Sequence, residues 1–164
     1  MTTAPLTVSR LFKAPLAMVW AATTDPSHQA QWLSPDNPAA FRSRMDFTVG
    51  GSHFYGSPNP DGSVMWGRQV YREIVPLKRV VCVQSFTDKD GNIAPHPMAP
   101  TWPREMLSTT DYEDLGDGTT RLTVTWVPLN ASAEQEATFD GARAGMNGGW
   151  DNQFNQIEAY LARL

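Results

Sequence analysis

The stretch that decides the fold is the C-terminal segment EQEATFDGARAGMNGGWDNQFNQIEAYLARL, residues 134–164. Apolar side chains recur along this segment at spacings of three and four, the repeat of one face of an α-helix. They are Phe139, Ala142, Met146, Trp150, Phe154, Ile157 and Leu161. The pattern predicts one long helix from Glu134 to Leu164, apolar on one side.

Glycines interrupt the middle of this predicted helix, at Gly145, Gly148 and Gly149. Each interior glycine destabilises a helix by roughly 1 kcal/mol relative to alanine. This cost suggests either close packing of the helix backbone against a neighbouring element or room for a guest molecule beside Met146 and Trp150. The segment alone leaves both interpretations open.

The rest of the chain is expected to form an antiparallel sheet. Leu6 to Phe12 alternates apolar and polar residues and predicts a first strand, and two short helices are expected after it, beginning at Pro15 and at Pro26. Turn residues separate the further predicted strands, which are residues 41–49, 52–56, 64–75, 79–87, 105–115 and 119–129. The proline-rich segment 93–103 is expected to be a loop. Helices segregated against an antiparallel sheet define an α+β domain, with the terminal helix laid across the concave face.

Length and composition bound the class of protein. The 164 residues are expected to form one domain, residues 1–164. Lys and Arg number 13 against 17 Asp and Glu, a balance that argues against nucleic acid or an anionic membrane as a partner. No apolar run approaches the roughly 20 residues that span a bilayer, and no signal peptide is visible. Cys82 is the single cysteine, so no internal disulfide forms and a cytoplasmic location is expected.

Several local motifs follow one another over nearly the whole chain. They are Arg10 to Trp20 with Thr24-Asp25-Pro26 and Trp32, Val49-Gly50-Gly51, Tyr71-Arg72-Glu73-Ile74-Val75-Pro76, Phe86 with Asp88 to Gly91, Asp114 to Leu122, and Gly149-Trp150 leading to Glu158-Ala159-Tyr160-Leu161. In this order the motifs resemble those of the START-like, or helix-grip, superfamily. More narrowly, the chain resembles the branch named after the C-terminal domain of the activator of heat-shock protein 90 ATPase.

The resemblance implies a curved antiparallel sheet wrapped around the terminal helix, with a deep apolar cavity between them. It says less about activity, because one fold hosts many functions. The chaperone-contacting N-terminal region of the namesake is not matched here, so chaperone regulation is a name that the family carries more than an expectation for this chain. Typical members also have an aromatic residue at the position of Gln84 and a glycine at the position of Gln69. The glutamines predict a more polar cavity wall if these positions face inward.

The residues expected to line the cavity and to contact a ligand come from several segments. They are Trp32, His53, Tyr55, Trp66, Gln84, Phe86, Trp102, Met106, Met146, Trp150 and Phe154. The helical residues among them are expected to form one wall, and strand alternation places Gln84 on the same face as Cys82 and Val80. Trp102 lies in the proline-rich segment, which is expected to be either a lid over the cavity or a plug at the end of the sheet. Ordinary core packing is the alternative role for each of these residues.

Few residues offer reactive chemistry. His53, with Tyr55 on the same strand face, has the type of side chain that transfers protons near neutral pH, although an exposed or hydrogen-bonded strand histidine is the plainer interpretation. The histidines and Cys82 lack metal-ligand spacing, and no cofactor is expected. Cys82 lies between valines, a setting that keeps a thiol protonated and inert.

The leading hypothesis is therefore a binder of a small apolar or aromatic molecule, more a non-enzyme than an enzyme. The first alternative is a cavity-based enzyme of the cyclase or hydrolase type, in which His53, Tyr55 or Gln84 would steer protons. The second is a stress-response or chaperone-linked interaction module. Such a module would pair as a homodimer through its exposed sheet edge or through the Trp102 loop.

Overall fold

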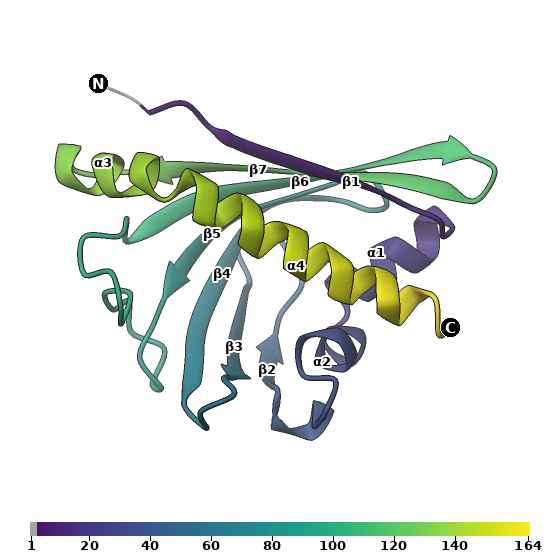
Figure 1. Ribbon diagram of the computed structural model, residues 1–164, viewed down its shortest axis with the longest axis horizontal. Coiled ribbons are helices and arrows are strands. Elements are labelled where there is room, and N and C mark those ends of the chain that lie inside the picture. Colours follow the sequence, from purple (N-terminus) through teal and green to yellow (C-terminus); the bar gives the residue numbers. More distant parts are fainter. Residues whose placement is uncertain (1–2) are drawn as a thin grey trace.

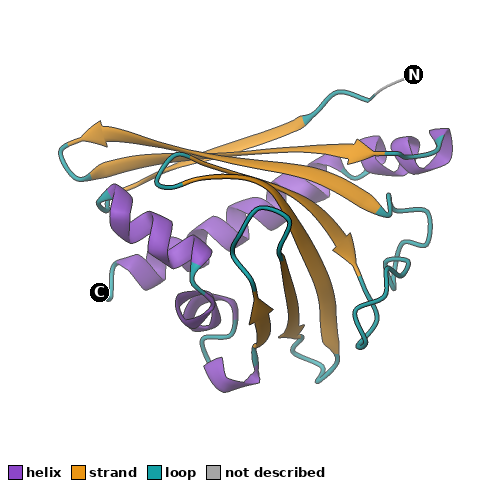
Figure 2. Ribbon diagram, turned by 180° about the vertical axis from the view of Figure 1, so that it is seen from behind, coloured by secondary structure: helices purple, strands orange, loops and turns teal. Residues whose placement is uncertain are grey.

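The computed structural model describes residues 3–164. Its strands form one seven-stranded antiparallel sheet in the order β1-β7-β6-β5-β4-β3-β2. The sheet curves around a long C-terminal helix, which crosses its inner face (Figure 1). Seen from behind, the outer face of the sheet carries no helix of residues 3–164 (Figure 2). The two short helices that follow the first strand lie near one end of the sheet, and the short helix that precedes the long C-terminal one lies near the other end (Figure 1). This is the expected α+β arrangement of the helix-grip fold.

The strands coincide closely with the expected segments. They are β1 Leu6–Phe12, β2 Arg42–Met45, β3 Ser52–Pro58, β4 Val64–Val75, β5 Arg79–Phe86, β6 Glu105–Gly116 and β7 Thr119–Leu129. The expected strand 41–49 is shorter than predicted because the chain turns at Asp46, whose amide donates to the Ser52 carbonyl. Gly50 completes this turn with a φ of 87°, a conformation that glycine adopts at no steric cost.

The helices are α1 Leu16–Thr24, α2 Pro26–Leu33, the 3-10 turn η1 Pro38–Ala40, α3 Ala133–Gly141 and α4 Arg143–Leu161. Asp25 caps α2 by accepting the Ser27 amide at 2.8 Å, and Pro26 occupies the first helical position, where its missing amide costs nothing. Within residues 3–164, no helix is long and apolar enough to cross a membrane.

The expectation of one continuous helix from Glu134 to Leu164 is wrong in one respect. Ser132 starts α3 with a reciprocal capping box to Gln135, but the helix ends at Gly141. Ala142 has a φ of −95° and a ψ of 2°, outside the regular helical range, and α4 begins after it. The apolar repeat runs through this junction, so the repeat predicted the face correctly and missed the break in the backbone.

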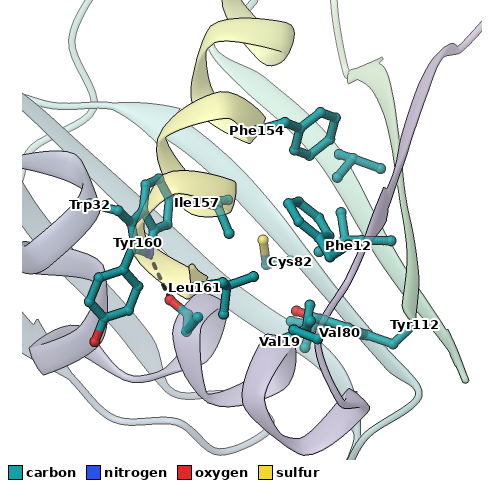
Figure 3. Packing of buried hydrophobic residues seen from close by; sticks show 14 of the residues in the cluster. Phe12, Val19, Trp32, Val80, Cys82, Tyr112, Phe154, Ile157, Tyr160 and Leu161 are labelled. Carbon is teal, nitrogen blue, oxygen red and sulfur yellow. Dashed lines mark hydrogen bonds between the residues drawn. The ribbon is translucent and has the colours of Figure 1, made fainter. Parts of the chain in front are cut away.

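Buried side chains form two clusters at the two ends of the sheet–helix space. The larger cluster packs Phe154 and Ile157 of α4 against Phe12 of β1 and Val19 of α1. Figure 3 shows this cluster closing around the C-terminal half of α4, with the Trp32 indole donating to the Ala22 carbonyl at 2.8 Å. The smaller cluster comprises Leu6, Trp102, Met106 and Phe139. Side chains of both clusters line the space that remains between them.

Candidate functional site

A cavity of about 440 Å³ lies between the inner face of the sheet and α4. This volume falls within the roughly 300–1,000 Å³ typical of small-molecule pockets. Most of its lining is apolar or aromatic. Helix α4 contributes Met146, Gly149, Trp150, Gln153, Phe154 and Ile157. The remaining lining comes from α1, α2, strands β3 to β7, the loop before β6, and the residues Phe41 and Phe47 on either side of β2.

A row of polar side chains crosses the inner face of three adjacent strands. His53 of β3 pairs in register with Gln69 of β4, and Gln69 pairs with Gln84 of β5. The next residue in the same row is Met106 of β6, where the wall becomes apolar. All of these residues line the cavity. We refer to His53, Gln69 and Gln84 as the polar row.

Tyr55 adds a hydroxyl to the polar row by reaching over an intervening strand. Its register partner on β4 is Gly67, and a Cβ added at Gly67 would lie 2.5 Å from Cζ of Tyr55. The missing side chain lets the phenol ring cross β4, where its hydroxyl accepts a hydrogen bond from Nε2 of Gln84 at 2.6 Å. Burial raises the pKa of Tyr55 to about 12, so the phenol stays protonated at neutral pH.

His53 is 2% exposed, and its Nε2 lies 2.7 Å from Oγ of Ser43 on the edge strand β2. Burial lowers the pKa of His53 to about 4, because the charged imidazolium loses its hydration, while the neighbouring Gln69 side chain opposes part of this shift. The ring is therefore neutral at pH 7. Its buried Nδ1 has no hydrogen-bond partner among the described residues.

A second polar group lies where α1 and α2 meet the cavity. The Tyr112 hydroxyl lies 2.7 Å from Oγ1 of Thr23, and burial raises the pKa of this phenol. Gln29 donates from Nε2 to the Thr23 carbonyl at 2.8 Å. Its Oε1 is buried and, within residues 3–164, unpaired. Both Gln29 and Tyr112 line the cavity, so this end also has hydrogen-bonding capacity.

An aromatic wall faces the cavity from the opposite side. Trp126 of β7 packs edge-on against Trp150 of α4, with ring centroids 5.3 Å apart, and Trp150 lies 5.5 Å from the ring of Phe154. Such pairs stabilise by about 0.5–1.5 kcal/mol beyond the area they bury. The Trp126 indole donates to Oγ of Ser108 at 2.9 Å, which fixes the orientation of its ring.

The proline-rich segment closes one end of the cavity. Trp102 is buried against Phe139 of α3, with ring centroids 5.9 Å apart, and it lines the cavity together with Pro103. His96 packs edge-on against Phe86 at 4.6 Å, which holds the loop on β5. The segment has only isolated bridges and no strand of its own, as its prolines predicted.

The glycines of α4 do not serve close backbone packing. An added Cβ at Gly145, Gly148 or Gly149 would meet no atom within 4 Å, and all three residues are exposed. Gly149 is the one of these three that borders the cavity. An exposed residue that also lines a cavity marks its opening, so Gly149 lies at the mouth, one helical turn from Gln153.

All residues expected to line the cavity do so except Trp66. Trp66 lies on the outer face of the sheet, where it stacks on Phe54 at 5.4 Å and covers Gly56. The alternation of β4 explains the difference. Gln69 and Tyr71 face the cavity, and Trp66, which is three residues before Gln69, points to the opposite face of the sheet. Contact of the remaining residues with a ligand stays a prediction.

Several lining residues were not anticipated, namely Thr23, Gln29, Phe41, Phe47, Tyr71, Tyr112, Leu122, Val124 and Trp126. Strand alternation could have identified three of them, because Leu122, Val124 and Trp126 are spaced by two along β7 and share one face of the sheet. The residues of α1 and α2 had no such indication, because the sequence does not say which turn of a short helix meets the sheet.

The cavity wall has no ionised side chain. Among the described residues that line it there is no Asp, Glu, Lys or Arg. Burial raises the pKa of Cys82 to about 12, so the thiol is protonated, as its position between valines predicted. In residues 3–164, no three His, Cys, Asp or Glu side chains come together as a candidate metal site. The wall offers hydrogen bonds and apolar contact.

Comparisons with known proteins agree with this architecture. The model of one family, described as Activator of Hsp90 ATPase homolog 1-like protein, matches residues 13–162. No curated protein matches the sequence. Among solved structures, a protein from Arthrobacter aurescens superposes with a TM-score of 0.75 at 23% identity, covering 98% of this chain and 87% of that one. A protein from Mycobacterium smegmatis gives a TM-score of 0.73 at 23% identity, with coverages of 94% and 88%. At these identities the likeness concerns the fold alone.

Proposed function

The chain belongs to the Activator of Hsp90 ATPase homolog 1-like family, and we propose that it binds a small apolar or aromatic molecule in the cavity between its sheet and α4. The observation that carries this proposal is the cavity itself, about 440 Å³ and lined mostly by apolar and aromatic side chains. Well-packed protein interiors keep few voids larger than a water molecule. A cavity of this size, with its mouth at the exposed Gly149, therefore favours binding of a molecule that enters from solution.

Binding without turnover fits the chemistry of the wall better than catalysis. A general base works best when its pKa lies near the operating pH, whereas the pKa of His53 is about 4. Tyr55 and Cys82 have pKa values near 12, so neither supplies a nucleophile at neutral pH. These values favour a binding role for the polar row over proton transfer.

The test uses N-phenyl-1-naphthylamine, a neutral compound whose fluorescence rises in apolar surroundings. Titration into the wild-type protein is expected to give a saturable rise. Gly149→Phe places a ring at the cavity mouth and is expected to weaken binding at least tenfold. Gly145→Phe is the matched control, since Gly145 is also exposed on α4 and does not border the cavity. A wild-type titration without saturation would contradict the function, and equal effects of the two substitutions would contradict entry beside Gly149.

A further inference from the structure

We propose that the cavity ligand is uncharged and carries a hydroxyl or carbonyl oxygen that binds at the polar row, while its apolar ring system lies against Trp150 and Met106. This inference rests on the function proposed above and adds the chemical class of the ligand. Two independent properties of the wall carry it. One is the absence of charge, and the other is hydrogen-bonding capacity that the protein itself leaves unused.

The uncharged wall argues for an uncharged ligand. An ion moved from water into an apolar cavity loses its hydration, and only a paired charge or several hydrogen bonds offset that loss. No Asp, Glu, Lys or Arg lines this cavity within the part of the chain that the structure describes. His53 supplies no positive charge either, because burial keeps it neutral at pH 7. A carboxylate or an ammonium group would therefore find no counter-ion.

The polar row argues for an oxygen on that ligand. The Tyr55 hydroxyl accepts from Gln84, and its own proton is donated to no acceptor within residues 3–164. Nδ1 of His53 is buried without a partner in the same part of the chain. Buried polar groups in native proteins are almost always hydrogen-bonded. A ligand oxygen at this point would accept from Tyr55, and a ligand hydroxyl would also satisfy an acceptor in the row.

The position of the row sets the orientation of the ligand. The row spans β3, β4 and β5 and ends at Met106 of β6. The aromatic wall stands at the far side, where Trp126 of β7 meets Trp150 of α4. A ligand whose oxygen lies at Gln84 thus directs its apolar part toward the sulfur of Met106 and the indole of Trp150. Both groups are polarisable and pack well against an aromatic ring.

Three probes that share one ring system test the inference. They are naphthalene, 2-naphthol and 2-naphthoate, which is ionised at neutral pH. Affinities are measured by isothermal titration calorimetry at pH 7. We expect 2-naphthol to bind about three- to tenfold more tightly than naphthalene, the effect of one neutral hydrogen bond. We expect 2-naphthoate to bind at least tenfold more weakly than 2-naphthol.

The double variant Tyr55→Phe/Gln84→Leu tests whether the preference for 2-naphthol over naphthalene arises at the polar row. It removes both partners of one hydrogen bond, so that neither is left buried and unsatisfied. We expect this variant to bind 2-naphthol and naphthalene with about equal affinity, so that the wild-type preference for 2-naphthol is lost. Saturable binding of naphthalene by the variant shows that its cavity is still formed. Gln156→Leu on α4 is the control, because Gln156 does not line the cavity.

The outcomes separate this inference from the function on which it rests. Equal affinities for naphthalene and 2-naphthol would overturn the role of the polar row and leave cavity binding standing. Preferred binding of 2-naphthoate would overturn the uncharged class of ligand. Failure of all three probes to bind would overturn the proposed function together with this inference.

Discussion

The ring of Tyr55 occupies the place that a side chain at Gly67 would need. These two residues pair in register on β3 and β4, and an added Cβ at Gly67 would lie 2.5 Å from Cζ of the phenol. Through this gap Tyr55 reaches Gln84 on β5, two strands from its own. One glycine thus positions the hydroxyl that extends the polar row.

Gly67→Ala is expected to destabilise the protein by about 1–3 kcal/mol, because the new methyl group displaces the Tyr55 ring from a packed wall. The free energy of unfolding is measured by urea denaturation. The same substitution is repeated in a Tyr55→Ala background, where the ring is absent and the cost should nearly vanish. An equal cost in both backgrounds would show that the strain does not come from Tyr55.

Alanine substitutions at two glycines of α4 are expected to have the opposite effect and to raise the free energy of unfolding. Gly145→Ala and Gly148→Ala should each stabilise the protein by about 0.5–1 kcal/mol, because alanine favours the helix and its Cβ meets no atom within 4 Å. Thermal and urea unfolding measure the gain. Gly118→Ala is the control that should destabilise, since Gly118 has a φ of 71°. A loss of stability in the helical variants would mean that the glycines serve a contact.

Strand periodicity explains why much of the fold was predictable. In Val64–Val75 and Thr119–Leu129 the bounds agreed with the expected strands, because turn residues flank both segments, and the second segment also alternates apolar and polar side chains. The helix break at Ala142 was not predicted, because the apolar repeat continues through it. A repeat reports which face is buried and is insensitive to a local change of backbone angles.

The site was predictable one element at a time and not as an assembly. Alternation placed Gln84 beside Cys82 on the inner face, and the helical repeat placed Trp150 on the wall. The hydrogen bond from Gln84 to Tyr55 depends on strand order and register, which join residues 29 positions apart. Trp66 lies on the outer face instead, because it is three residues from Gln69 on β4 and successive strand residues point to opposite faces.

Cys82 is expected to resist alkylation in the folded protein. With a thiol pKa of about 12, only about one in ten thousand thiols is ionised at pH 8, and the thiolate is the reactive form. Labelling by N-ethylmaleimide, followed by mass spectrometry, should be at least about a hundredfold slower in buffer than in urea. The chain has one cysteine, so the readout is unambiguous. Similar rates in the two conditions would contradict the burial of the thiol.

His53 is expected to make stability fall as the pH is lowered from about 6.5 toward 4. Its pKa is about 4 in the folded chain and near 6.5 when unfolded, so over this range only the unfolded state takes up the proton. The full difference, on the order of 3 kcal/mol, is reached near pH 4, and about 2 kcal/mol of it is lost by pH 5. Urea unfolding of wild type and His53→Gln at pH 7.5, 6 and 5 measures it, because glutamine does not titrate and the carboxylates are common to both proteins. Loss of the contact with Ser43 lowers the free energy of unfolding of the variant by the same amount at every pH. The titration of His53 lowers the free energy of unfolding of the wild type alone, so the difference between the two proteins becomes smaller as the pH falls. Parallel curves would show that His53 is already free to ionise in the folded state.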